Sequence, residues 1–339
     1  MSAMTPRARV RQAIRHAPPD AVPYHFSYTP PARRKLEAYY GTTDLDAALN
    51  NHIVKYKPRC ADYLTPVGPN LWRDEFGVVW NWDGATDIGT PANCVFAARS
   101  LAGYAFPDPF LPCRYANLPA FIDANRDRFR VVNLGKSLFE RAWSMRGMQN
   151  LLMDMVEAPA WVEALLDAIT DFNLHTIAEV TRYDIDAVMF GDDWAGQRGL
   201  LFSPAMWRRY IKPRIAAMYG AVKRAGKAVF IHCCGKVQEL FPELIKLGVD
   251  VFNPFQPEVM DLAAIKRQFG DQLAFYGGMS VQQVLPFGDE QAVRAEARRL
   301  MDVIGQGGGY IIAPSHDMPG DIPVENMVAF IETVRSGTA

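Results

Sequence analysis

The 339-residue chain lacks several features that would by themselves define its class. It contains no run of about 18 apolar residues, which excludes a transmembrane helix. Its formal net charge is -1 at pH 7, its pI is about 6.6 and it has no basic stripe, so neither nucleic acid nor an anionic membrane is an expected partner. The first residues carry charge but no apolar core of a secretory signal, and their pattern favours an amphipathic first helix.

Cysteine is also scarce. The five cysteines are Cys60, Cys94, Cys113, Cys233 and Cys234, an odd number that is scattered apart from the adjacent pair. This pattern is not that of a disulfide framework, and it predicts a cytoplasmic protein in a reducing compartment.

The second half of the chain alternates short apolar runs with amphipathic helical patterns. Strands are expected at 186–191, 228–231, 249–252, 273–276 and 310–313, and helices at 204–223, 237–247, 262–269, 289–304 and 324–334. Successive βα units require a parallel sheet, because each parallel pairing needs a crossover. We therefore expect an α/β fold, a (β/α)8 TIM barrel forming a single domain over residues 1–339.

The first third of the chain is less regular. Residues 21–28 and 129–134 are candidates for early barrel strands, and 113–142 resumes the α/β pattern. The segment 75–84, EFGVVWNWDG, alternates and ends in Asp-Gly, which predicts a hairpin inserted in the barrel. Trp80 and Trp82 share one face of it, either as a small aromatic core or as a lid over the barrel mouth.

The expected strands of the second half end in polar residues, in the motifs GDDW, HCCG, NPFQP, GGMS and PSHD. In a barrel these loops meet on the face that carries the chemistry. Side chains alternate along a strand, so His232 and Cys234 project to the same side and Cys233 to the other. His316 lies at an equivalent strand end. Two imidazoles and a thiolate are suitable ligands for zinc, with a fourth position open for catalysis.

Several of these residues could instead have a purely structural role. His232 could be a hydrogen-bonded core histidine, and Asp192 and Asp193 could cap the next helix or pair with Arg198. Trp194 serves equally well for packing or as a platform for substrate.

The long motifs GDDWAGQRGLLFSPAMWRRYIKPR, IHCCGKVQELFPELIKLGVDVFNPFQPEV and GGGYIIAPSHDMPGDIPVEN resemble the uroporphyrinogen decarboxylase superfamily. The resemblance runs from about residue 186 to 336 and implies a (β/α)8 barrel with its cleft at the carboxyl ends of the strands. Decarboxylases of that superfamily carry an arginine-rich PFRQAGR-like loop and an aspartate in an FSD-like strand end, and the N-terminal third here has neither.

The chain is more similar to the zinc methyltransferases of the superfamily, which work with corrinoid proteins. Their H-x-C motif corresponds to His232 and Cys234, whereas their later cysteine is replaced by His316. A site richer in nitrogen favours an ether or alcohol oxygen over a thiol. The resemblance therefore implies an O-demethylating methyltransferase whose corrinoid (cobalamin) is carried by a partner protein, because the chain has no D-x-H-x-x-G segment.

The expected site follows from these arguments. The metal ligands are His232, Cys234 and His316, with Glu140 or water as a further ligand; the catalytic residues are Asp193, Gln197 and Glu140; the substrate-binding residues are Trp194, Asn253, Gln256, Tyr276 and Met279. The alternatives are a cofactor-free decarboxylase, in which Asp193 or His316 handles protons, and a non-catalytic barrel that binds a tetrapyrrole or corrinoid. A homodimer is one open possibility for the assembly.

Overall fold

A parallel sheet of seven strands forms the centre of the computed structural model, which describes residues 4–83 and 89–337. The strand order is β1-β6-β7-β10-β11-β12-β13, and every pairing is parallel. The strands are β1 (Ile53–Tyr56), β6 (Phe129–Lys136), β7 (Ala187–Gly191), β10 (Ala228–His232), β11 (Val251–Phe255), β12 (Ala274–Met279) and β13 (Tyr310–Pro314). The expected α/β class and the strands of the second half are thus present.

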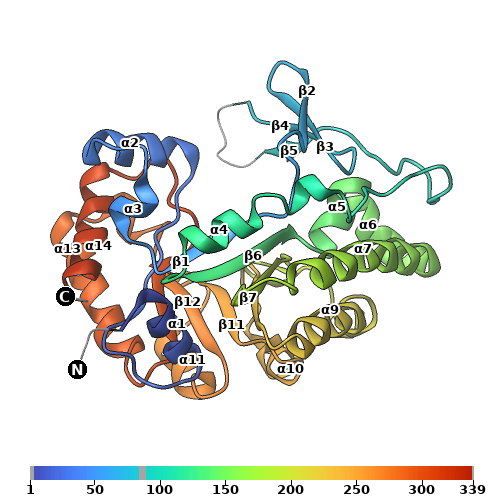
Figure 1. Cartoon of the computed structure of the whole chain (residues 1–339). Helices are drawn as coiled ribbons and strands as arrows, with labels where there is room; N and C mark the ends of the chain where they lie inside the picture. The colour runs from blue at the N-terminus through green and yellow to red at the C-terminus, as the bar shows by residue number, and fades with distance from the viewer. Residues whose placement is uncertain (1–3, 84–88, 338–339) are drawn as a thin grey trace.

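Helices cover the outer face of the curled sheet (Figure 1). They are α1 (Pro6–Ile14), α2 (Pro30–Tyr40), α3 (Leu45–Leu49), α4 (Leu118–Ala124), α5 (Phe139–Arg146), α6 (Met148–Glu157), α7 (Pro159–Val180), α8 (Pro204–Met206), α9 (Lys212–Arg224), α10 (Phe241–Lys246), α11 (Leu262–Phe269), α12 (Val284–Phe287), α13 (Glu290–Arg299) and α14 (Val324–Ser336). Two expected helices contain a π-helical turn, at Trp207–Ile211 and at Leu300–Ile304. No helix in the described part of the chain is long and apolar enough to cross a membrane.

The inward-facing side chains of the strands form one apolar cluster, which α1 closes at the amino ends of the strands. Alternate residues such as Phe129 and Val131 of β6 belong to it, together with Val10 of α1. Alternation puts every second side chain inside the curl. Because α1 fills the amino end, the carboxyl ends of the strands are left as the face for a site.

The segment expected as a strand at 21–28 is not a strand. It makes only isolated parallel bridges, from Tyr24 to Ile312 and from Tyr28 to Met318. On its other side the backbone makes one backbone bond, from His52 N–H to the carbonyl of Tyr24 (3.2 Å), and its own N–H groups bond to side chains: Phe26 N–H donates to Asn51 Oδ1 (2.7 Å), and Tyr24 N–H to Nδ1 of His52 (3.4 Å). Side-chain acceptors thus replace a ladder with β1, so the described residues form seven named strands in this sheet rather than eight.

A small antiparallel sheet protrudes from the rest of the molecule (Figure 1). It contains β2 (Leu64–Gly68), β3 (Leu71–Asp74), β4 (Val79–Asn81) and β5 (Thr90–Pro91). The inserted hairpin therefore exists, and the Asp-Gly end of the expected segment, at Gly84, lies outside the described residues. The turn between β3 and β4 lies at 75–78, where Oδ1 of Asp74 accepts the N–H groups of Phe76 and Val78. Trp80 thus belongs to the second arm, β4.

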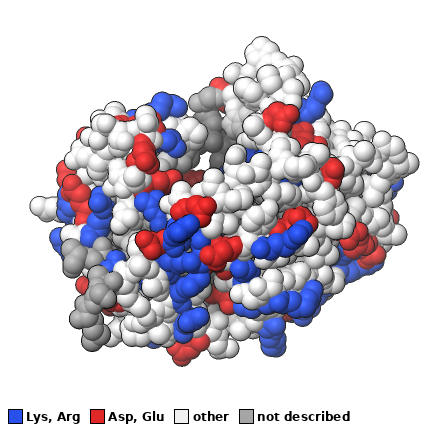
Figure 2. All heavy atoms as spheres, in the orientation of Figure 1, with Lys and Arg blue, Asp and Glu red and all other residues white. Residues whose placement is uncertain are grey.

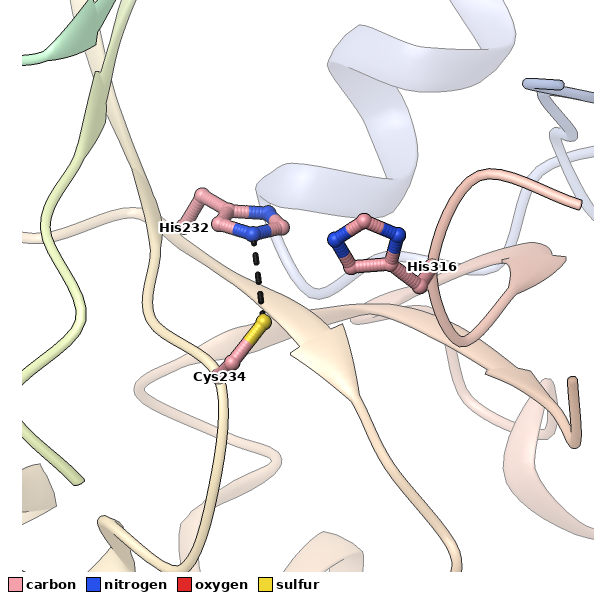
Figure 3. A group of neighbouring side chains, drawn as sticks. All are labelled: His232, Cys234 and His316. Atoms are coloured by element: carbon pink, nitrogen blue, oxygen red, sulfur yellow. Dashed lines mark hydrogen bonds between the residues drawn. The ribbon is translucent and has the colours of Figure 1, made fainter. Parts of the chain in front are cut away.

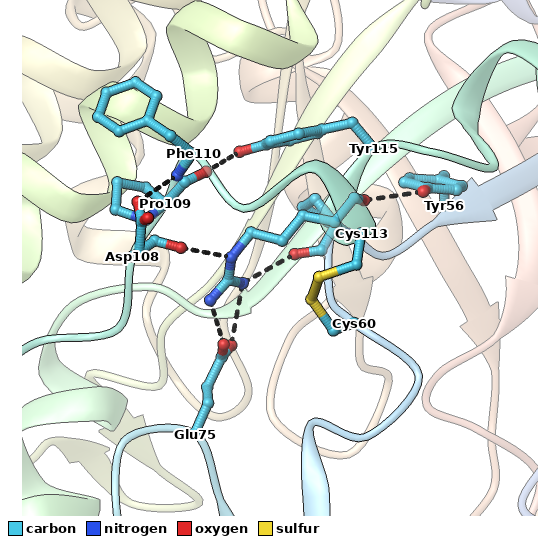
Figure 4. The surroundings of a disulfide bond; sticks show 10 residues. Tyr56, Cys60, Glu75, Asp108, Pro109, Phe110, Cys113 and Tyr115 are labelled. Atoms are coloured by element: carbon cyan, nitrogen blue, oxygen red, sulfur yellow. Dashed lines mark hydrogen bonds and ion pairs between the residues drawn. A yellow bond between two sulfur atoms is a disulfide. The ribbon is translucent and has the colours of Figure 1, made fainter.

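Two cysteines that were expected to be free form a disulfide, Cys60–Cys113, with Cα atoms 5.0 Å apart (Figure 4). They lie 53 residues apart in sequence. Folding brings them together because the chain after β1 runs beside the turn that contains Arg114, whose carbonyl accepts from Tyr56 Oη at 2.8 Å. The scattered cysteines therefore do not argue for a reducing compartment.

On the visible face of the molecule, acidic and basic side chains are interspersed (Figure 2).

Candidate metal centre

Three potential metal ligands meet at the carboxyl ends of β10 and β13. His232 ends β10, Cys234 follows two residues later, and His316 lies just beyond β13. Their ligand atoms all lie within 4.8 Å of one another. Sγ of Cys234 is 3.3 Å from Nε2 of His232, and the two imidazole rings have centroids 5.5 Å apart (Figure 3).

The imidazole of His232 is held in one orientation. Its Nδ1 lies 2.7 Å from Oδ1 of Asn253, while Nδ2 of Asn253 donates to the carbonyl of Tyr276 at 2.9 Å. The second bond fixes the amide, so Oδ1 is the acceptor and the proton of His232 sits on Nδ1. Nε2 is then unprotonated and faces Cys234, the arrangement that metal-binding histidines adopt.

The loop that carries Cys234 is also fixed by hydrogen bonds. The backbone N–H of Cys234 donates to Oδ1 of Asp193 (2.7 Å), and that of Gly235 to Oε1 of Gln256 (2.7 Å). Gly235 has φ +90°, and a Cβ there would lie 2.7 Å from the carbonyl oxygen of Gly196. Only glycine can make this close turn after the thiol.

Burial controls the protonation of the centre. Burial lowers the pKa of His232, which keeps its imidazole neutral, and raises the pKa of the Cys234 thiol, to which the Asp193 carboxylate adds. The thiol is therefore protonated, and a cation bound there would displace the proton. Two nitrogens and one sulfur that converge in this way fit zinc with a fourth position free.

Carboxyl groups adjoin the centre and hold protons unusually tightly. Burial raises the pKa of Glu140 to about 8, and the nearby charges of Asp193 and Asp192 add to the effect. Burial raises the pKa of Asp192 to about 7, although it accepts the backbone N–H of Glu140 (2.7 Å) and the indole N–H of Trp194 (2.5 Å). Glu140 can therefore hold a proton beside the candidate ligands at neutral pH.

A cavity of about 470 Å³ opens at these strand ends. Six of the expected residues line it: Glu140, Asp193, His232, Asn253, Tyr276 and His316. A cavity of this size accommodates a small molecule.

Four expected residues lie elsewhere. Trp194 is 1% exposed and packs against Trp207, so its interpretation as a wall of the cleft is wrong. Gln197 is exposed on the hairpin of β8 (Ala195–Gly196) and β9 (Gly199–Leu200). Met279 is buried in the core. Gln256 supports the Gly235 turn instead of lining the cavity. The alternation rule fails for Trp194 and Gln197 because both follow the end of β7.

Sequence reasoning missed several residues that line the cavity. Lys55 of β1 lies 5.3 Å above the ring of Tyr276, whose hydroxyl bonds to Nδ1 of His25 at 2.6 Å. Burial lowers the pKa of Lys55 to about 8. Asp317, next to His316, also lines the cavity, and Lys55 holds its pKa low although burial acts to raise it. The sequence signal that could have identified Lys55 is the alternation of lysines in IVKYKP, where an apolar strand carries cations on one face.

The family model and the sequence relatives indicate one family. The family model "Uroporphyrinogen decarboxylase (URO-D)" matches residues 136–337. A uroporphyrinogen decarboxylase of Methylococcus capsulatus is 25% identical over 252 residues, which cover 72% of this chain and 70% of that protein. One of Coxiella burnetii is 22% identical over 185 residues, 54% of this chain, and the chain spans only 49% of its length, about half.

One solved structure resembles the whole chain. A methyltransferase from Methanosarcina mazei superposes with a TM-score of 0.73 over 99% of this chain and 100% of that one, at 17% identity. At this identity the match establishes a shared fold.

Proposed function

Since the chain belongs to the uroporphyrinogen decarboxylase family, whose model matches more than half of its length, we propose that it is a zinc-dependent methyltransferase of that superfamily. The superfamily resemblance expected from the sequence motifs is thereby confirmed. The proposed reaction moves a methyl group from an O-methylated small molecule to a corrinoid carried by a partner protein. The single observation that carries the proposal is the convergence of His232, Cys234 and His316.

The donor set favours oxygen chemistry. When bound, zinc would act as a Lewis acid on the ether oxygen of the substrate. Asn253 keeps Nε2 of His232 free to bind zinc, and Asp193 holds the Cys234 loop by accepting the backbone N–H of Cys234 at 2.7 Å. Glu140 lines the same cavity and retains its proton near neutral pH, so it can protonate the departing alkoxide or phenolate oxygen.

The fold supports the same proposal. We infer that the segment around Tyr24, which bridges to β13 and bonds to the residues before β1, occupies the place of the eighth strand of a (β/α)8 barrel. Such a barrel presents its chemistry at the carboxyl ends of the strands, where the three ligands lie.

Metal content and methyl transfer test the function together. Protein purified without chelator should contain about one zinc per chain, and the Cys234→Ala, His316→Ala double variant should contain almost none. The intact protein should methylate a reduced corrinoid protein from a panel of methoxylated compounds, and the double variant should not. Cys94→Ala, at a free cysteine away from the site, is the matched control. Unchanged zinc in the double variant, or no transfer across a broad panel with zinc present, would contradict the proposal.

A cofactor-free decarboxylase is the second candidate. It is favoured by the description of the family model and by Lys55 and Lys136, two cations in the cavity that suit a carboxylate substrate. Metal dependence separates the two functions, because a decarboxylase of this kind keeps its activity after chelation. A barrel that binds a corrinoid tightly without turnover would indicate the non-catalytic alternative.

A further inference from the structure

A second cavity, of about 400 Å³, continues from the metal cavity toward the inserted sheet. The two cavities share four lining residues, Trp80, Asn133, Gly135 and Lys136. A single small molecule can therefore extend from the metal centre into the second cavity.

The carboxylates that line the second cavity already have partners. Asp74 forms an ion pair with Arg141 at 2.7 Å and accepts the indole N–H of Trp80 at 3.0 Å. Glu75 forms an ion pair with the guanidinium of Arg114, beside the disulfide (Figure 4). Each of these two carboxylates is thus paired with an arginine, and their charges act on Arg59 and Lys136 only from beyond ion-pair distance.

Three cations that line the same cavity have no ion-pair partner among the described residues. Lys57, Arg59 and Lys136 line it, and none of them has a carboxylate partner within ion-pair distance in the described part of the chain. The ammonium group of Lys136 lies 3.9 Å from the ring centroid of Trp80, and the guanidinium of Arg59 lies 3.7 Å from that of Tyr63. Aromatic faces thus hold two of the cations without neutralising them.

The three cations also repel one another. Burial lowers the pKa of Lys57, and the charge of Arg59 lowers it further, although the charge of Asp317 opposes both. Burial lowers the pKa of Lys136, and Lys57 is one of the charges that add to this effect, although Glu140 opposes it. Gathering cations in a cavity is unfavourable unless an anion joins them.

We propose that Lys57, Arg59 and Lys136 form a subsite for an oxyanion group of the substrate, so that the methyl donor is a methoxylated aromatic acid. The inference rests on the proposed function and names its substrate class. The anionic end lies in the second cavity, the aromatic ring lies against Trp80, and the methoxy group reaches the metal cavity. The same cations exclude quaternary ammonium compounds as methyl donors.

Calorimetric binding to the metal-ligand double variant, Cys234→Ala with His316→Ala, tests the subsite without any turnover. The probes are 4-methoxybenzoate, its neutral amide 4-methoxybenzamide, and 4-methoxyphenyl phosphate. A charge-assisted contact predicts that at least one anion binds on the order of ten-fold more tightly than the amide. The stronger of the two anions then identifies the oxyanion as carboxylate or phosphate. Equal affinity for both anions and the amide would overturn the proposal.

Variants of the lysines locate the effect. Lys57→Met and Lys136→Met should each weaken binding of the anion on the order of ten-fold and leave binding of the amide unchanged. Lys57→Arg should retain most of the affinity, and Lys246→Met, at an exposed lysine of α10, is the control. If Lys57→Met and Lys136→Met bind the anion as the parent does, the subsite is wrong.

The binding result is separable from the proposed function. Preference for the anion in the double variant supports the subsite even if no methyl transfer is ever found. Methyl transfer from neutral donors with no preference for acids would support the function and refute the subsite.

Discussion

Asn253 fixes the imidazole of His232: its Oδ1 lies 2.7 Å from Nδ1, which leaves Nε2 directed at the sulfur of Cys234. The partner comes from the neighbouring strand, since His232 of β10 and Asn253 of β11 are paired in register. The sheet therefore sets both the ligand and the group that orients it. An outer partner of this kind raises the basicity of the ligand and limits its rotation.

Asn253→Ala should lower zinc affinity by about ten- to hundred-fold, because Nδ1 of His232 loses its acceptor. Asn253→Asp keeps an acceptor and should retain more of the affinity. Competition with a chromophoric chelator measures both. Asn326→Ala, at a buried amide that donates to Leu285 and Gly288, is the matched control and should bind zinc normally. Normal affinity in Asn253→Ala would show that the bond does not orient the ligand.

His52 should make the fold sensitive to acid. Burial lowers its pKa from 6.5 to about 3. In the unfolded chain His52 becomes protonated near pH 6.5, whereas in the folded chain it stays neutral down to about pH 3. The contribution of His52 to the free energy of unfolding is therefore fully present above pH 6.5 and is lost as the pH falls toward 3. Between about pH 8 and about pH 5, this single group should cost ~2 kcal/mol of unfolding free energy.

His52→Phe isolates the effect, because it keeps a ring against Tyr24, whose centroid lies 4.0 Å away, and cannot titrate. Between these two pH values the unfolding free energy of His52→Phe, measured with urea, should fall by ~2 kcal/mol less than that of the parent. His175→Phe, at an exposed histidine, is the control. A pH dependence in His52→Phe equal to that of the parent would show that folding does not lower the pKa of His52.

The Cys60–Cys113 bond should stabilise the protein. It closes a segment of 53 residues, for which the chain-entropy model gives a contribution of about 4 kcal/mol as an upper value. Cys60→Ser with Cys113→Ser should therefore lower the urea midpoint, and reductant should lower that of the parent to the same value. Cys94→Ser is the control, because its hydroxyl can still donate to the carbonyls of Phe96 and Arg146. A parent protein indifferent to reductant would mean that the bond does not form.

The ligands could be predicted from sequence because they depend on one rule. Alternation, extended past the end of β10, predicts His232 and Cys234 on one side, and the parallel sheet brings His316, just beyond β13, beside them. Beyond the strand ends the outcome depends on loop contacts: hydrogen bonds to Asp193 and Gln256 hold the Cys234 loop at the site, whereas Trp194, after β7, packs in the core.

The second cavity could not be predicted for a different reason. Its walls come from the inserted sheet and from the chain after β1, including Arg59. Their approach depends on long-range contacts, such as the disulfide and the Glu75–Arg114 ion pair, that no local pattern encodes.

The strand expected at 21–28 is absent for a similar reason, because the side chains of Asn51 and His52 accept backbone N–H groups of that segment.

The two tryptophans of the insertion should behave differently, which tests whether it is core or lid. Trp80 is 5% exposed, donates its indole N–H to Asp74 and lies under Lys136. Trp82 is only partly buried, and its ring centroid lies 6.4 Å from that of Trp80. Both line the second cavity.

Trp80→Ala should therefore cost about 3–5 kcal/mol of unfolding free energy, as a truncated core aromatic does. Trp82→Ala should cost less than about 1 kcal/mol, because a partly exposed ring loses less buried area. It should nevertheless weaken binding of 4-methoxybenzoate, since its face contributes to the wall of the cavity. Urea unfolding and calorimetric titration measure the two effects separately. Loss of stability in both variants with unchanged ligand affinity in Trp82→Ala would mean that the whole insertion is core; loss of affinity alone in both would mean that the whole insertion is a lid.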